Sequence, residues 1–163
     1  MPKSRKKQRK SKAPGGADAA LSPHARADTM SRATAALNAG DVANAERLAK
    51  RIILSDPAAF DAIEVLASVH FRKGDAKAAA ALLRKAAANA PAHAGMHFNL
   101  GIALYHSGEG DAAVESFQKA LYLDPNYPDG FFELGGILNS LGRGEDAVEA
   151  YKESLRRRPD DAV

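Results

Sequence analysis

The sequence predicts an all-α protein, a solenoid of helix–turn–helix repeats, and two observations lead to this prediction. First, residues 96–125 read as two amphipathic helices joined at a glycine, because apolar residues recur at spacings of three, four and seven. Second, prolines and glycines recur every 34 residues without an insertion, and a fixed period of this length indicates stacked repeats. The residues in register are Pro57, Pro91, Pro125 and Pro159, with Gly40, Gly74, Gly108 and Gly142.

The stretch 94–127 also resembles a tetratricopeptide repeat (TPR), a helix–turn–helix unit of about 34 residues. The residues that match the family's pattern are Leu100, Gly101, Ala113, Phe117, Ala120 and Pro125. The stretch departs from the pattern at its fourth position, where His97 stands in place of the usual Trp. The resemblance implies a right-handed α-solenoid in which the first helix of each repeat lines a concave groove. The predicted repeats are 26–59, 60–93, 94–127 and 128–161.

Each predicted repeat holds two helices. In repeat one the first helix, about residues 27–39, has Thr29, Arg32 and Ala33 where bulky apolar residues are usual, as expected of an N-terminal cap repeat. In repeat two the run AAAALL favours a helix strongly. In repeat three Gly101 should let another helix approach closely. In repeat four Pro128 stands near a helix start, where proline is tolerated.

The N-terminal stretch differs from the rest in charge. Residues 1–12 hold seven of the 23 basic residues and no acidic one, and residues 13–24 are small and turn-prone. Neither stretch can bury enough apolar surface to fold, so we expect residues 1–24 to form a disordered basic tail. The remaining 16 basic residues face 20 acidic ones, so the net charge of +3 becomes −4 without the tail.

Composition excludes several classes. The chain has 163 residues and no cysteine, which excludes disulfides and thiolate metal sites and fits a reducing compartment. No apolar core follows the basic start, so no signal peptide is predicted. No apolar run approaches the roughly 18 residues that span a membrane. We therefore expect a cytoplasmic protein with no membrane partner.

No set of catalytic residues is evident. Gly108-Glu109-Gly110 lacks the lysine and the preceding strand that phosphate binding needs. His93 and His97 have the spacing that can seat a metal on a helix, but no third ligand accompanies them, so structural roles are expected. We predict no enzyme activity for the chain by itself, no metal and no cofactor.

A binding surface is the remaining candidate. In a TPR array, positions 2, 5, 9 and 12 of each repeat form a stripe on the groove side, and four of the ten Phe and Tyr residues fall on it. Their alternative role is packing between repeats. Acidic residues edge the stripe, which favours a basic partner. The predicted groove residues are Asp61, Glu64, Phe71, Phe98, Asn99, Ile102, Tyr105, His106, Asp129, Phe132, Glu133 and Asn139.

The resemblance implies a protein–protein interaction module that binds a peptide segment of a partner in this groove. One alternative is the recruiting part of a larger enzyme, because TPR arrays are commonly fused to methyltransferases, sulfotransferases and protein glycosyltransferases. Arrays of the glycosyltransferase type often keep Asn at position six, and here that position reads Ser31, Val65, Asn99 and Glu133, which does not support it. The other alternative is a nucleic-acid-associated protein that binds polyanions unspecifically through its basic tail.

The C-terminal edge raises a separate expectation. TPR arrays normally end with an extra helix, and the chain stops four residues after Pro159. Val148, Tyr151 and Leu155 should then lack a covering repeat, and a joined apolar patch of this kind is a docking surface. A second copy of the chain covers it, or further residues of a longer parent protein do. The third alternative is that Tyr151 lies under its own repeat and only Val148 and Leu155 are exposed.

Overall fold

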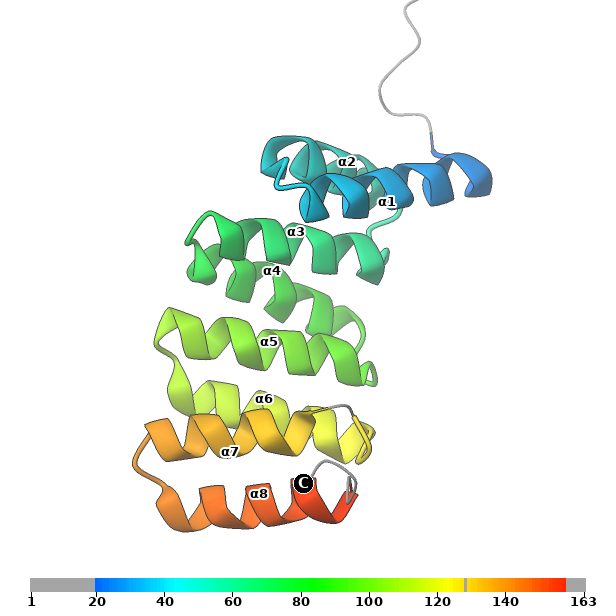
Figure 1. Cartoon of the computed structure of the whole chain (residues 1–163). Helices are drawn as coiled ribbons and strands as arrows, with labels where there is room; N and C mark the ends of the chain where they lie inside the picture. The colour runs from blue at the N-terminus through cyan, green and yellow to red at the C-terminus, as the bar shows by residue number, and fades with distance from the viewer. Residues whose placement is uncertain (1–19, 128, 158–163) are drawn as a thin grey trace, which may run out of the picture.

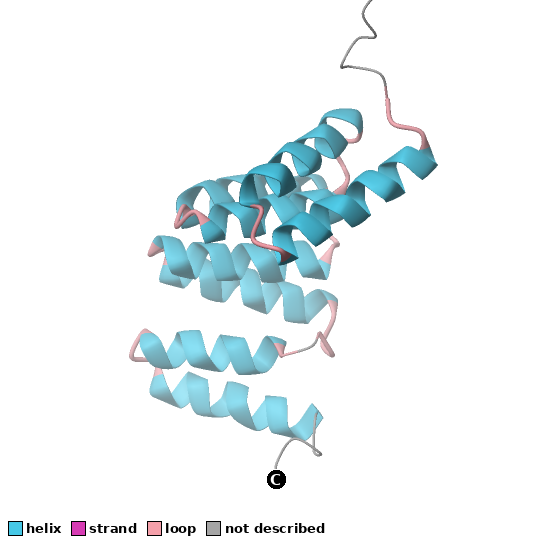
Figure 2. Cartoon of the chain, turned by 45° about the horizontal axis from the view of Figure 1, so that its top comes forward, coloured by secondary structure: helices cyan, strands magenta, loops and turns pink. Residues whose placement is uncertain are grey.

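The computed structural model describes residues 20–127 and 129–157, and within these ranges all regular structure is α-helical (Figure 2). The helices form antiparallel pairs that stack into a right-handed α-solenoid (Figure 1), which confirms the all-α prediction. The basic residues 1–12, on which the nucleic-acid alternative rests, lie outside the described ranges. The helices are α1 (Pro23–Asn38), α2 (Val42–Ser55), α3 (Phe60–Arg72), α4 (Ala76–Asn89), α5 (Ala94–Ser107), α6 (Gly110–Leu123), α7 (Gly130–Ser140) and α8 (Gly144–Arg157).

The turn inside each helix pair depends on a glycine in the left-handed region. The four glycines 34 residues apart have φ between +74° and +90°, a conformation that a residue without a Cβ adopts at little cost. After the first two of these turns an aspartate caps the second helix. Asp41 accepts a hydrogen bond from the Asn44 N–H at 3.1 Å, and Asp75 accepts one from the Ala78 N–H at 2.9 Å. Glycine followed by aspartate therefore defines where these pairs turn.

Helix α1 begins earlier than the sequence analysis predicted. Ser22 caps the helix, and Pro23 takes its first position, where the missing N–H is not needed. The Leu21 N–H also donates a hydrogen bond to Ser55 Oγ at 2.8 Å. The prediction that disorder extends to residue 24 was therefore wrong at its C-terminal end, because a Ser-Pro helix start was read as part of the tail.

The core forms where small residues of one helix meet large residues of the next. A Cβ placed on Gly101 in α5 would lie 2.6 Å from the ring of Phe117 in α6, and Phe117 is fully buried. The same contact recurs one period later, where a Cβ on Gly135 would lie 2.7 Å from Tyr151. The close helix approach predicted at Gly101 is confirmed.

At the C-terminal edge, helix α8 buries Ala147 and Ala150. Tyr151 lies against Gly135 within its own helix pair, as the third alternative for this edge requires. Only Val148 and Leu155 are left as exposed large apolar residues on α8, with exposed fractions of 50% and 51%. None of the described helices is long and apolar enough to cross a membrane.

Candidate partner-binding face

Side chains of α3, α4 and α5 line a cavity of about 230 Å³. At one end of it Asn99 Nδ2 donates a hydrogen bond to Glu64 Oε1 at 3.0 Å, which joins α5 to α3. The cavity therefore combines a carboxylate, an amide and a mainly apolar wall. Its lining residues are Glu64, Ala67, Ser68, Phe71, Leu83, Asn99 and Ile102.

A larger open cleft of about 490 Å³ continues from this cavity, because both are lined by Phe71 and Ile102. The rings of Phe71 and His106 meet edge to face with centroids 5.8 Å apart, an arrangement that aromatic rings favour. Tyr105 packs its ring 5.5 Å from that of His106. We call the residues around the two cavities the α3/α5 face. The cleft is lined by Phe71, Gly74, Ala76, Ile102 and His106.

Glu64 is the distinctive charge of this face. Burial raises the pKa of its carboxyl above the ordinary value of 4.5, whereas the nearby His93 and the hydrogen bond from Asn99 act in the opposite direction. Burial, followed by the charge of Glu64, also raises the pKa of the Tyr127 hydroxyl. Among the described residues, no ion pair includes Glu64. This partly buried carboxylate thus has an amide as its hydrogen-bond partner and, among the described residues, no cation within ion-pair distance.

Asp61, by contrast, already has a cationic partner. Arg26 Nη2 donates a hydrogen bond to Asp61 Oδ1 at 2.8 Å, and Arg26 Nε lies 3.8 Å from Asp56. Asp61 and Arg26 line an open cleft of about 620 Å³ between α1 and α3. Within the predicted acidic edge on α3, the charge of Asp61 is therefore neutralised by Arg26.

The predicted residues on α7 lie apart from the α3/α5 face. Phe132 is 57% exposed, and its ring lies 5.7 Å from that of Tyr151. Glu133 and Asn139 are exposed as well, and neither lines one of the two linked cavities. The structure thus divides the predicted groove into a hollowed part on α3 and α5 and an exposed part on α7.

Phe98 belongs to the packing between repeats. Its ring meets that of Phe117 edge to face at 5.1 Å and lies 4.6 Å from the ring of Tyr127. Phe98 is partly buried and joins the core cluster that connects α6 and α7. The packing role that the sequence analysis kept as an alternative is the one that this residue has.

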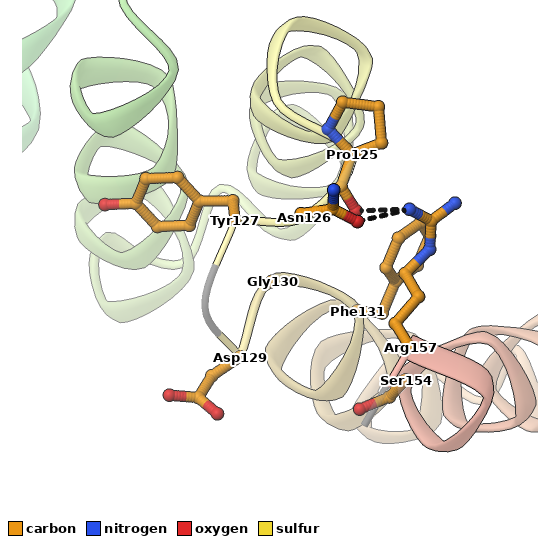
Figure 3. A pocket seen from close by; sticks show the side chains of 8 residues that line it. All are labelled: Pro125, Asn126, Tyr127, Asp129, Gly130, Phe131, Ser154 and Arg157. Atoms are coloured by element: carbon orange, nitrogen blue, oxygen red, sulfur yellow. Dashed lines mark hydrogen bonds between the residues drawn. The ribbon is translucent and has the colours of Figure 1, made fainter. Parts of the chain in front are cut away.

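A pocket of about 140 Å³ lies where the turn between α6 and α7 meets α8 (Figure 3). Arg157 Nη1 donates hydrogen bonds to the carbonyl oxygen of Pro125 at 2.8 Å and to Asn126 Oδ1 at 3.0 Å. Its guanidinium also lies over the ring of Phe131, 5.0 Å from the centroid. Asp129, predicted as a groove residue, lines this pocket instead. Arg157 fixes the turn against α8, which is a structural role.

The two histidines considered as metal ligands have structural contacts. His93 precedes α5, and its Nδ1 accepts a hydrogen bond from the Met96 N–H at 3.2 Å, which caps the helix. His97 Nε2 lies 3.2 Å from the carbonyl oxygen of Pro91. In the part of the chain that the structure describes, no three His, Cys, Asp or Glu residues are grouped as a metal ion would require.

One model of the tetratricopeptide repeat matches residues 30–94 and 66–129, and a second model of this repeat matches residues 128–161. The chain belongs to the tetratricopeptide repeat family. It is thus a TPR protein-interaction module. A comparison with curated protein sequences finds no match.

Solved structures of other TPR proteins resemble this TPR array. A crystal structure of MamA protein has 25% sequence identity and a TM-score of 0.71, over 82% of this chain and 73% of that one. MamA from Desulfovibrio magneticus RS-1 has 22% identity and a TM-score of 0.73, over 85% of this chain and 78% of that one, which shows a common fold. An O-GlcNAc transferase mutant from Thermobaculum terrenum has 34% identity and a TM-score of 0.63, over 69% of this chain but 22% of the transferase.

Some residues of the face were missed in the sequence analysis. Ser68 stands on the predicted stripe, so its position could have identified it. Leu83 belongs to α4, a second helix, and reaches the cavity from behind the stripe. Gly74 lies in the turn after α3 and Ala76 at the start of α4, so neither stands at a position of the predicted stripe.

Proposed function

We propose that this TPR array binds a short extended segment of a partner protein on the α3/α5 face and performs no catalysis of its own. The observation that carries the proposal is the pair of linked cavities lined by Phe71 and Ile102. Ligand sites are usually concave and mainly apolar, with a few polar groups that fix orientation. Glu64 and Asn99 are such polar groups at one end.

An apolar side chain of the segment occupies the cleft beside His106. A side chain anchored in a pocket of this kind contributes about 2 kcal/mol or more to an interface, which corresponds to at least a tenfold change in affinity. The partly buried side chain of Ile102 and the exposed imidazole of His106 are one turn apart on α5 and both line the cleft, so each should contribute to the anchor.

A selection of ten-residue random peptides on the full-length chain tests the proposal. Peptides that bind are then measured singly by fluorescence anisotropy against the wild type and against Ile102→Ala and His106→Ala. Each substitution should weaken binding about tenfold while the helical circular dichroism signal stays unchanged. Tyr122→Ala is the matched control, because Tyr122 is 79% exposed on α6, away from the face, and it should change affinity less than about twofold.

Two results would overturn the proposal. One is a selection that enriches no peptide. The other is a set of peptides whose affinity is unchanged by both substitutions in the cleft, which would place binding elsewhere on the array.

A second candidate function is the recruiting array of a larger enzyme. The 34% identity to the TPR-containing part of an O-GlcNAc transferase favours it. The single Asn99 at position six, where the three other repeats have Ser31, Val65 and Glu133, counts against the glycosyltransferase type. An antibody raised against the chain would distinguish a separate module from part of a larger enzyme in a native lysate, because a fusion would run far above 17.2 kDa.

A further inference from the structure

Glu64 differs from the other carboxylates that the structure describes on the first helices. It lines a cavity and is partly buried, and its only hydrogen bond to a described residue comes from Asn99 to Oε1. Oε2 therefore has no protein donor within the described ranges. A carboxylate can accept about four hydrogen bonds, so most of its capacity is unused.

The energetic consequence is that Glu64 carries a desolvation cost that no ion pair offsets, and the only charge that acts against it is the more distant charge of His93. Burying a carboxylate is unfavourable unless a cation or several donors face it, and here the single donor is a neutral amide. Asp61, one turn earlier on α3, has Arg26 at 2.8 Å. Glu46 on α2 has both Lys50 and Lys73. A cation supplied by a bound partner would pair with Glu64 in the way that protein cations pair with Asp61 and Glu46.

The same two helices place an aromatic pair at a fixed distance from this carboxylate. Glu64 and Phe71 are seven residues apart on α3, and Asn99 and His106 are seven residues apart on α5. Seven residues are two helical turns, or about 10.5 Å along the axis. An extended segment advances about 3.3–3.6 Å per residue, so it covers this distance in about three residues.

We propose that Glu64 is a subsite for a lysine or arginine side chain of the bound segment, about three residues from the apolar side chain held by Phe71 and His106. This inference rests on the proposed function and names the chemistry of its ligand. The phenyl wall of Phe71 borders the carboxylate cavity and can cover the aliphatic stem or the guanidinium plane of the cation. Asn99 holds the carboxylate in place from the other helix.

The test uses the same random ten-residue library, selected in parallel on the wild type, Glu64→Gln and Glu115→Gln. Gln keeps the size of the side chain and can still accept the hydrogen bond from Asn99, so the fold is retained. Glu115 is exposed on α6 and gives the same substitution away from the face. The wild type and Glu115→Gln should enrich Lys or Arg about three positions from an apolar residue, whereas Glu64→Gln should keep the apolar preference and lose the basic one.

Single peptides then give the magnitude. Replacing the selected Lys or Arg by Gln should weaken binding to the wild type about tenfold and binding to Glu64→Gln less than twofold. If the peptides selected on the wild type share an apolar residue but show no preference for Lys or Arg, the subsite is overturned and the proposed function stands. A basic preference that survives in Glu64→Gln would overturn it too. A wild type that enriches no peptide would refute the proposed function and the subsite with it.

Discussion

Replacing Gly101 by Ala tests the packing of this array most directly. The added Cβ would lie 2.6 Å from two ring carbons of Phe117 and 3.1 Å from a third. Phe117 is fully buried, so its ring cannot turn aside into solvent. Overpacking of this kind costs about 1–3 kcal/mol. The gain in helix propensity from Gly to Ala is about 1 kcal/mol, so the free energy of unfolding should fall by up to about 2 kcal/mol.

Gly136→Ala is the matched control. Gly136 is also inside a helix, but it is exposed, and a Cβ there would meet only the Tyr151 hydroxyl at 3.7 Å, an ordinary contact. This variant should gain the propensity term of about 1 kcal/mol without a clash. Because that term cancels between the two variants, their stabilities should differ by about 1–3 kcal/mol, or about 2–12 °C in melting temperature.

Thermal and urea unfolding, followed by the helical circular dichroism signal, measure this difference. The reasoning is refuted if Gly101→Ala melts at or above Gly136→Ala, because the ring of Phe117 would then have room that the structure does not provide.

Two further predictions concern charge and the C-terminal edge. Hydrogen bonds from Lys50 and then Lys73 lower the pKa of Glu46 from 4.5 to about 2. Its contribution to stability is therefore present above about pH 4.5 and is lost as the pH falls towards 2. Glu46→Gln should lower the free energy of unfolding by less than about 1 kcal/mol near neutral pH, because such exposed pairs contribute little, and urea unfolding should show the difference shrinking in acid; a difference that grows in acid contradicts this. Val148 and Leu155 are each about half exposed, so Val148→Glu with Leu155→Lys should change stability by less than about 0.5 kcal/mol and leave a monomer in sedimentation. A wild-type dimer that the double variant abolishes would show that this edge is a docking surface.

The fold could be predicted because its determinants repeat. The left-handed glycines and the small residue that faces a large ring recur at one period, so a single chain contains several copies of the same evidence. Gly101 and Gly135 show this, since each lies against an aromatic ring 16 residues further along the chain. The start of α1 was missed although Pro23 stands one period of 34 residues before Pro57, because Ser22 and Pro23 lie within a stretch of turn-prone composition.

The binding face could be predicted only in part, because a stripe of residues is not yet a cavity. The wall between α3 and α5 needs Ile102, and the equivalent position one repeat later is Gly136, which has no side chain to form a wall. Phe132 and Asn139 therefore stand on the stripe without lining a hollow there. The charge of Asp61 was likewise misjudged, because its partner Arg26 comes from a helix that the sequence analysis began four residues too late.

A separation of 35 residues relates neighbouring side chains on adjacent first helices. Arg26 and Asp61 are joined in this way, and so are Glu64 and Asn99. Phe71 and His106 follow the same rule through their rings. Applying the rule to the other two junctions places different chemistry at the positions equivalent to the carboxylate–amide and the aromatic–imidazole pairs. Between α1 and α3 the equivalent pairs are Met30 with Val65 and Leu37 with Arg72. Between α5 and α7 they are Phe98 with Glu133 and Tyr105 with Ser140.

The junction of α3 and α5 thus differs from the other two in a way that the repeat itself does not require. Between α1 and α3 the first pair is apolar, so no carboxylate is held there. Between α5 and α7 Phe98 takes the place of Glu64 and packs into the core, which leaves Glu133 exposed and without an amide partner across the junction. A residue set needed only to stack repeats would serve equally well at each junction. That the desolvated carboxylate, its amide and the ring pair meet at one junction alone is the reason to place the partner there.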